Sequence, residues 1–201
     1  MQTKILLPTQ HNMELAAKAI LENKIVCYPT DTIYGIAANP FSQQAVSKIF
    51  QAKQRPDNKP IILLASKNYP LENLVYINKQ TKEIIKKYWP ASLTIIFKLK
   101  EHTLASQITC GSDTIAIRVP DNNLCNSLCE LAGGLITSTS ANLSGKEVKT
   151  TAQDILAEFG SSAFAYILDG GTTQNTTPST IIDATGENIK VLRMGKVMIE
   201  L

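Results

Sequence analysis

Short apolar runs rich in Ile, Val and Leu recur along the chain, and between them the apolar residues follow a helical spacing. Continuous apolar runs bounded by polar residues are typical of strands that are buried on both faces of a sheet. The predicted strands are residues 25–28, 61–64, 93–98, 114–119, 135–139, 165–168, 179–182 and 190–193.

The intervening segments predict amphipathic helices. In residues 13–23, Ala16 and Ile20 share one helical face, as expected of a helix that packs on a sheet. The predicted helices are residues 13–23, 42–51, 81–88, 122–131 and 151–159, with Ser42 and Thr151 as N-caps. Helices and strands alternate, but some strands follow one another directly near the C-terminus. We therefore predict an α/β fold with a sheet of mixed direction.

Length and composition favour one globular domain. Of the 201 residues 44% are hydrophobic, which is enough for one continuous core, and no repeat or linker divides the chain. We therefore predict a single domain over residues 1–201. The net charge of +3 is too small to indicate a nucleic-acid binder, although it would not repel ATP or tRNA.

No apolar run approaches the roughly 20 residues of a membrane span, and the N-terminus lacks the apolar core of a signal peptide. We expect a cytoplasmic protein without a membrane partner. Cys27, Cys110, Cys125 and Cys129 lie in or beside apolar runs. This pattern is more typical of reduced core thiols than of disulfides or a metal site.

Two segments rich in hydroxyl groups follow predicted strands. Residues 28–35 (Tyr-Pro-Thr-Asp-Thr-Ile-Tyr-Gly) lie at a strand end, where ligands bind in α/β sheets, but an ordinary turn is an equally good interpretation. Residues 133–145 place Ser, Thr and Asn at another strand end, where small side chains let an anion reach the backbone N–H groups. A Ser/Thr-rich turn is the alternative there.

A cationic segment, residues 53–60, carries Lys53, Arg55 and Lys59 together with two prolines. These cations could bind a polyphosphate through charge-assisted hydrogen bonds, although a solvated basic loop is the commoner origin of such a run. The chain contains no Walker A motif.

Arg193 ends one predicted strand, and Arg118 lies next to the end of another. An arginine that emerges from a buried strand must pair with an anion, and a protein carboxylate and a bound ligand are equally good partners at this point. Neither His11 nor His102 lies in a triad order or a metal-ligand cluster. Together these residues predict a hydroxyl-lined, cationic pocket without an obvious nucleophile and without a protein metal site.

Seven segments, in order along the chain, resemble motifs of the YrdC-like family, and the length resembles its short-form members. They are residues 28–35, 53–56, 89–94, 115–120, 138–145, 178–183 and 192–195. Any one motif is weak, whereas seven in sequence order are specific. Ala91-Ser92 departs from the Gly-Pro usual after Trp89-Pro90, and Met194 stands where proline or glutamine is commoner.

The resemblance implies a twisted, open mixed sheet with flanking helices around a deep basic cavity. It also implies a threonylcarbamoyl-AMP synthase, a nucleotidyltransferase that converts L-threonine, bicarbonate and ATP into threonylcarbamoyl-AMP and pyrophosphate. The product would serve the formation of N6-threonylcarbamoyladenosine (t6A) at position 37 of tRNA by a downstream transferase complex of the TsaB, TsaD and TsaE type. Mg²⁺ is expected to be held by ATP rather than by a protein cage.

The same resemblance implies residue roles. Threonine would be bound by Thr32, Arg118, Ser138 and Ser179. ATP would be bound by Lys53, Arg55, Lys59, Thr114, Ser140, Asn142, the backbone of Val148 and Arg193, with Lys53 and Arg55 also catalytic at the phosphates. A carbamate is already an anionic nucleophile, so such a site needs alignment and charge neutralisation rather than a catalytic base.

Two other functions stay open. One is a non-catalytic module that binds double-stranded RNA through a concave basic surface, and the other is a paralogue that transfers a carbamoyl group. Pyrophosphate release separates the enzymes from the RNA-binding module, and the amino-acid requirement separates the two enzymes.

Overall fold

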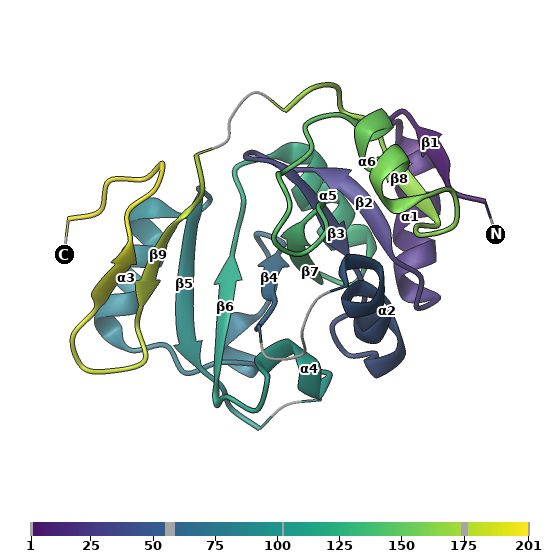
Figure 1. Ribbon diagram of the computed structural model, residues 1–201. Coiled ribbons are helices and arrows are strands. Elements are labelled where there is room, and N and C mark those ends of the chain that lie inside the picture. Colours follow the sequence, from purple (N-terminus) through teal and green to yellow (C-terminus); the bar gives the residue numbers. More distant parts are fainter. Residues whose placement is uncertain (1, 55–58, 102, 174–176, 201) are drawn as a thin grey trace.

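The structure is a computed structural model, and it describes residues 2–54, 59–101, 103–173 and 177–200. One ten-stranded sheet has the order β1-β8-β2-β3-β7-β4-β6-β5-β9-β10, and it twists strongly along its length (Figure 1). The strands are β1 (Lys4–Leu6), β2 (Val26–Pro29), β3 (Tyr34–Ala37), β4 (Ile62–Ala65), β5 (Leu93–Lys98), β6 (Thr114–Arg118), β7 (Leu135–Ser140), β8 (Tyr166–Leu168), β9 (Thr180–Asp183) and β10 (Lys190–Arg193).

The sheet is open and of mixed direction, as predicted. Strand β2 is antiparallel to β3 and parallel to β8, and β5 is antiparallel to β6 and parallel to β9. Strands β1 and β3 are additional to the predicted ones. Because β1 has three residues and β3 contains Gly35, neither forms the continuous apolar run used for the prediction.

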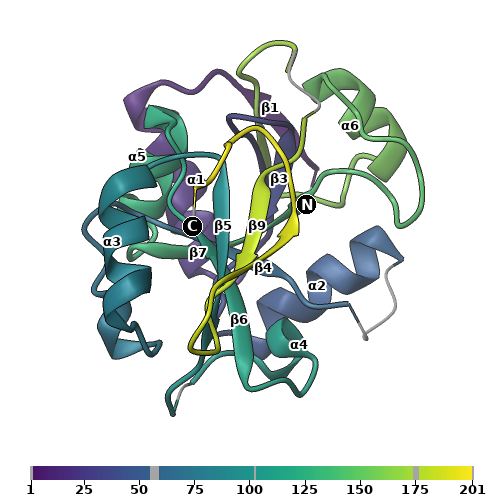
Figure 2. The same ribbon diagram turned by 90° about the vertical axis from the view of Figure 1, so that its left-hand side faces the viewer.

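The helices cover both sides of the sheet. They are α1 (Gln10–Leu21), α2 (Gln43–Lys53), α3 (Lys79–Tyr88), α4 (Ser106–Thr109), α5 (Asn123–Leu131) and α6 (Ala152–Phe159), with a 3-10 turn at Leu71–Asn73. Figure 2 shows α1, α3 and α5 on one side of the sheet and α2, α4 and α6 on the other. All five predicted helices are present, and α4 is an extra short one. No helix in the described part of the chain is long and apolar enough to cross a membrane.

Side-chain caps fix where the predicted helices begin. Ser42 accepts a hydrogen bond from the N–H of Ala45, and Thr151 accepts one from the N–H of Asp154, so both predicted N-caps are confirmed. Helix α2 continues to Lys53 instead of ending at residue 51. This extension places Lys53 on a helix.

Two apolar clusters hold the layers together. In one cluster, Ala16 and Ile20 of α1 pack with Leu128 of α5 against the sheet. In the other, Ile49 of α2 packs with Leu63 of β4 and other strand residues. Since the strand interiors are filled by these contacts, polar side chains are left at the strand ends. The functional groups of the molecule gather there.

Candidate functional site

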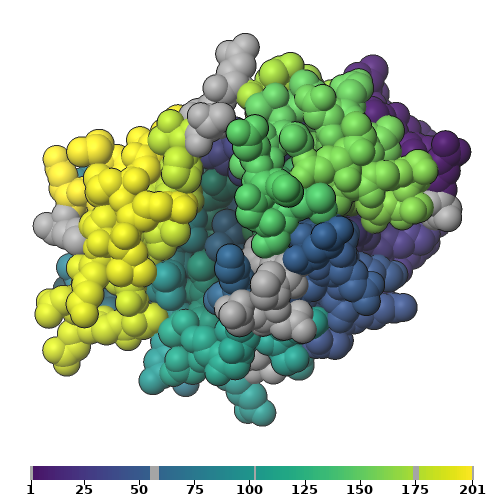
Figure 3. All heavy atoms as spheres, viewed as in Figure 1, coloured from purple at the N-terminus to yellow at the C-terminus, as the bar shows by residue number. Residues whose placement is uncertain are grey.

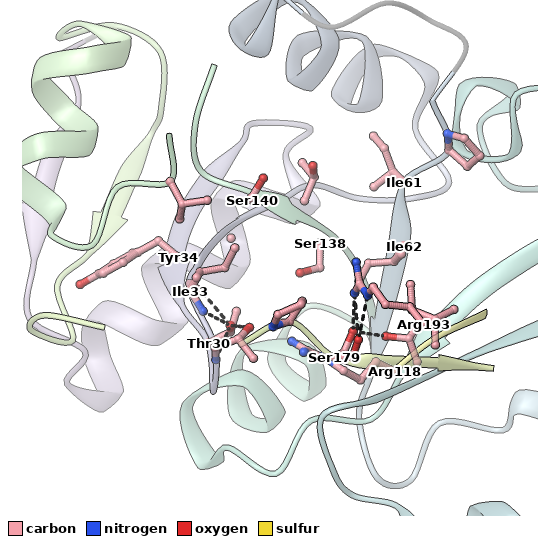
Figure 4. Close-up of a pocket in the computed structure, with 18 residues that line it drawn as sticks. Thr30, Ile33, Tyr34, Ile61, Ile62, Arg118, Ser138, Ser140, Ser179 and Arg193 are labelled. Atoms are coloured by element: carbon pink, nitrogen blue, oxygen red, sulfur yellow. Dashed lines mark hydrogen bonds between the residues drawn. The ribbon is translucent and has the colours of Figure 1, made fainter. Parts of the chain in front are cut away.

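A cavity of about 410 Å³ lies where the polar ends of β3, β6, β7 and β9 meet. The space-filling view is hollowed between the yellow C-terminal segment and the green segment that carries α6 (Figure 3). Figure 4 shows Arg118, Ser138, Ser140, Ser179 and Arg193 around the cavity. Two guanidinium groups and several hydroxyl groups therefore face one space, as the sequence predicted.

The polar segment after β2 forms the turn of the β2–β3 hairpin. The Thr30 side chain donates to the carbonyl of Ile33 at 2.6 Å and accepts from the N–H groups of Thr32 and Ile33. The Thr30 and Thr32 hydroxyl oxygens lie 3.1 Å apart, and both residues line the cavity. The sequence left a turn and a ligand-binding segment as alternatives, and here the turn presents its hydroxyl groups to the cavity.

Ser138 on β7 approaches the backbone of β3 closely. A Cβ atom at Gly35 would lie 3.3 Å from Ser138 Oγ, so glycine keeps this part of the cavity wall open. Tyr28 Oη donates to Ser138 Oγ at 3.2 Å. Burial raises the pKa of Tyr28 well above its usual value, so this phenol stays a protonated donor that orients the Ser138 hydroxyl.

Arg118, the last residue of β6, is almost fully buried at the cavity. Its Nη2 lies 3.1 Å from Oδ1 of Asp31, with exposed side-chain fractions of 4% and 9% for Arg118 and Asp31. Asp31 also accepts a hydrogen bond from the Ser92 hydroxyl. Of the two partners that the sequence left open for Arg118, the structure shows a protein carboxylate.

Ser179 and Arg193, from the C-terminal part of the chain, are hydrogen-bonded to each other at the cavity. Arg193 Nη2 and Nε donate to the carbonyl of Ser179 at 2.9 and 3.1 Å. The Ser179 hydroxyl lies 2.8 Å from that of Thr94 on β5. Gly195 makes this arrangement possible, because a Cβ atom there would lie 2.2 Å from the carbonyl oxygen of Pro178.

Lys53 is buried, and its ammonium donates to the backbone carbonyls of Ser140 and Asn142. The Ser140 hydroxyl in turn donates to the amide oxygen of Asn142, whose amide nitrogen donates to the carbonyls of Leu143 and Lys146. These contacts fix the segment after β7. Lys53 thus holds Ser140 in place at the cavity without being one of its lining residues.

The structure brings together some of the predicted site residues. All four residues expected to bind threonine line the cavity, and so do three of those expected to bind ATP: Thr32, Arg118, Ser138 and Ser179, with Ser140, Val148 and Arg193. Arg55 lies outside the described residues.

Other predicted ATP-binding residues lie apart from the cavity wall. Thr114 sits at the opposite end of β6 from Arg118, where its hydroxyl pairs with that of Ser112 at 2.8 Å. Lys59 is exposed next to Pro60, which does line the cavity, and Asn142 is buried and accepts a hydrogen bond from the Ser140 hydroxyl.

Tyr34 is a cavity residue to which the sequence analysis gave no role. Its Oη donates to the carbonyl of Gly171 at 2.7 Å and accepts from the N–H of Gly170 at 3.1 Å. Burial raises the pKa of Tyr34 to about 12, so the group stays neutral at physiological pH. Its place within residues 28–35 was the available signal, but a tyrosine on a strand usually indicates packing alone.

The described residues contain no group of three or more His, Cys, Asp or Glu side chains that could hold a metal ion. The cavity offers hydroxyl groups, backbone groups and cations. This donor set suits an anionic ligand, including one that carries its own metal ion.

The fold and site together define an α/β protein with a mixed open sheet and a cavity at its strand ends that is lined by hydroxyl groups and two arginines. A family model of Sua5, YciO and YrdC proteins, described as telomere recombination, matches residues 18–195. The chain belongs to this family.

Curated relatives carry consistent names. A putative threonylcarbamoyl-AMP synthase of Methanocaldococcus jannaschii is 37% identical over 188 residues, covering 94% of this chain and 87% of that protein. The threonylcarbamoyl-AMP synthase of Bacillus subtilis is 36% identical over 183 residues, covering 90% of this chain and 53% of that protein. The chain therefore spans about half the length of some curated relatives that it matches.

A solved structure agrees with the fold. Pyrococcus abyssi Sua5 complexed with L-threonine superimposes with a TM-score of 0.87 at 34% identity, covering 96% of this chain and 57% of that one.

Proposed function

We propose that this protein is a threonylcarbamoyl-AMP synthase, a nucleotidyltransferase that joins L-threonine, bicarbonate and ATP. The observation that carries the proposal is the convergence of Thr32, Arg118, Ser138 and Ser179 on one cavity. The names of the curated relatives and the threonine complex of P. abyssi Sua5 support it.

In the proposed reaction, the amino group of threonine forms a C–N bond to the carbon of bicarbonate, and water leaves to give a carbamate. A carbamate oxygen then attacks the α-phosphorus of ATP, and the bond from that phosphorus to the pyrophosphate oxygen breaks. The nucleophile needs no deprotonation at this step. The site therefore has to align two anions and neutralise charge, which is consistent with a cavity that has two arginines.

The proposal assigns the two arginines to different substrates. Arg118 binds the threonine carboxylate, because a planar guanidinium matches a carboxylate through paired donors. Arg193, Ser140 and Val148, which also line the cavity, contact ATP. The part of Lys53, Arg55, Lys59, Thr114 and Asn142 in phosphate or nucleotide binding stays a prediction from the family resemblance.

Mg²⁺ is proposed to arrive with ATP and to supply further neutralisation of phosphate charge when bound. The product is proposed to be used in the cytoplasm for N6-threonylcarbamoylation of adenosine 37 in tRNA, by a transferase complex of the TsaB, TsaD and TsaE type. A mixed anhydride of a carbamate and a phosphate is a reactive acyl-type donor, which is consistent with consumption by a transferase.

The decisive experiment measures pyrophosphate release and identifies the nucleotide product with ATP, threonine and bicarbonate together and with each omitted in turn. We expect release only with all three. Equal turnover without bicarbonate would exclude the carbamate route. No pyrophosphate release together with salt-resistant binding of double-stranded RNA would favour the RNA-binding module, and turnover without an amino acid would favour a carbamoyl-transfer paralogue.

A further inference from the structure

Three side chains from separate parts of the sequence contact one another in series, and the last of them lines the cavity. The Ser92 hydroxyl donates to Oδ2 of Asp31, and Oδ1 of Asp31 lies 3.1 Å from Nη2 of Arg118. Asp31 belongs to the β2–β3 turn, Ser92 directly precedes β5, and Arg118 ends β6. Arg118 lines the cavity, whereas Asp31 and Ser92 do not appear in its wall.

We propose that Ser92 and Asp31 are positioning residues that set the orientation of Arg118 and thereby the affinity for an α-carboxylate. This inference rests on the proposed function, in which Arg118 binds the carboxylate of threonine.

The backbone around Ser92 is fixed on both sides. The N–H of Ala91 donates to the carbonyl of Val119 at 2.9 Å, and the carbonyl of Ser92 accepts from the N–H of Thr180 at 3.0 Å. The Ala91-Ser92 backbone is therefore tied to the residue that follows Arg118 and to the residue that follows Ser179. A hydroxyl held in this way gives Asp31 one preferred orientation, since rotation of the carboxylate would break its hydrogen bond.

The ion pair leaves hydrogen-bonding capacity for a ligand. Nη2 of Arg118 faces Oδ1 of Asp31, whereas the buried Nε of Arg118 has no hydrogen-bond partner among the described residues. A guanidinium carries five N–H donors, so contact with one oxygen of Asp31 does not exhaust it. An Arg118 group that is already buried and held in place can receive a second carboxylate with little loss of side-chain freedom.

A purely structural ion pair is the alternative. Burial of two charges is costly, and a carboxylate without hydrogen bonds would be tolerated poorly. In that alternative, the loss of the Ser92 hydroxyl lowers stability and affects both substrates alike. In our proposal it changes the kinetics for threonine and leaves those for ATP unchanged.

The test compares Ser92→Ala, Ser92→Thr and Asp31→Asn in the full chain, with pyrophosphate release as the activity and separate titrations of threonine and ATP. We expect Ser92→Ala to raise the KM for threonine about tenfold, equivalent to about 1.4 kcal/mol, and to leave the KM for ATP within about twofold. Ser92→Thr keeps the hydroxyl and is expected to restore most of the affinity. Asp31→Asn should raise the KM for threonine further, because it removes the charge that faces Arg118.

Ser47→Ala is the matched control. Ser47 on α2 donates to Gln107 Oε1 at 2.8 Å, so this change also removes one side-chain hydrogen bond of a serine, but away from the cavity. It should leave both KM values at the wild-type level. Thermal melting of each variant reports whether it is folded. If Ser92→Ala does not fold, the threonine and ATP kinetics of Asp31→Asn test the inference in its place.

Several outcomes would overturn the inference. Ser92→Ala and Asp31→Asn with unchanged threonine KM values would show that neither residue positions Arg118. Equal increases for threonine and ATP would indicate the structural alternative. A lower threonine KM in Asp31→Asn would show that Asp31 competes with the substrate. If the wild-type protein does not use threonine, the proposed function is wrong and the inference falls with it. If the wild type uses threonine and the variants show no change in threonine KM, only the inference is wrong.

Discussion

The ammonium of Lys53 lies 2.7 Å from the backbone carbonyl oxygen of Asn142 and also donates to the carbonyl of Ser140. Lys53 is the last residue of α2, and Ser140 is the last residue of β7. One buried lysine thus joins a helix end to the segment that carries a cavity hydroxyl. A charge that is 2% exposed is tolerated because such carbonyls replace its water.

Lys53→Ala is expected to lower both stability and activity. Hydrogen bonds to a charged group contribute about 1.5–3 kcal/mol, and for a chain of this size 1 kcal/mol corresponds to roughly 2–4 °C in melting temperature. Displacement of Ser140 should also lower the single-turnover rate at saturating ATP, by on the order of 100-fold. Melting curves and rapid-quench measurements of the nucleotide product check this.

Lys98→Ala is the control for Lys53, because Lys98 is an exposed residue at the end of β5. It should behave as the wild type does. A Lys53→Ala protein with an unchanged melting temperature and an unchanged single-turnover rate would contradict the proposed anchoring.

Arg118→Lys is expected to weaken threonine binding about tenfold or more and to leave ATP binding nearly unchanged. Lysine keeps a positive charge beside Asp31, which favours folding, but a single ammonium cannot replace a planar fork of donors. Calorimetric titrations with each substrate measure the two affinities. A loss of ATP affinity alone would indicate that Arg118 binds the nucleotide and not threonine.

Serine should be a poorer substrate than threonine. A site that buries the threonine methyl group loses about 1–3 kcal/mol of apolar contact with serine, which corresponds to roughly 10–200-fold in kcat/KM. Apolar side chains of the cavity wall, including Ile33 and Ile181, are available for that contact. Competition between the two amino acids in one reaction measures the ratio of their kcat/KM values directly. A ratio near one would show that the site does not prefer threonine.

The cysteines should differ in reactivity. Cys27, Cys125 and Cys129 are buried, and burial raises the pKa of Cys125 to about 12 and also raises those of Cys27 and Cys129 well above their usual value. At pH 8 these groups stay protonated and unreactive, while Cys110 is partly exposed. A disulfide reagent should therefore modify one thiol quickly in the native protein and all four after denaturation. Rapid labelling of Cys125, located by mass spectrometry, would contradict this.

The apolar pattern was sufficient to predict most of the sheet, because strands buried on both faces appear as continuous apolar runs. Strand β5 at Leu93–Lys98 and strand β10 at Lys190–Arg193 match their predicted bounds. The pattern could not reveal β3, which is paired through a tight turn and includes Gly35. The pattern also could not predict the strand order, because β7 lies between β3 and β4, which are far from it in sequence.

For the site, the sequence indicated which residue types matter but not what each one contacts. Arg118 emerged from a buried strand, yet its pairing with Asp31 depends on the β2–β3 hairpin, and the sequence left that segment open between a turn and a ligand-binding strand end. Lys53 was placed in a basic loop because its segment is charged, and the structure shows it inside α2 with its ammonium buried. Contacts between residues far apart in sequence decided both cases.

The C-terminal edge of the sheet has a consequence for how binding could be observed. All four residues of β10 are exposed, and among the described strands β10 pairs with β9 alone, with an irregular register between Val191 and Arg193. Backbone amides here should exchange with deuterium quickly in the free protein, because local opening breaks few contacts. A nucleotide that engages Arg193 would clamp this edge through Ser179 and slow the exchange. The outermost strand would then report occupancy of an interior cavity, without any label on the substrate.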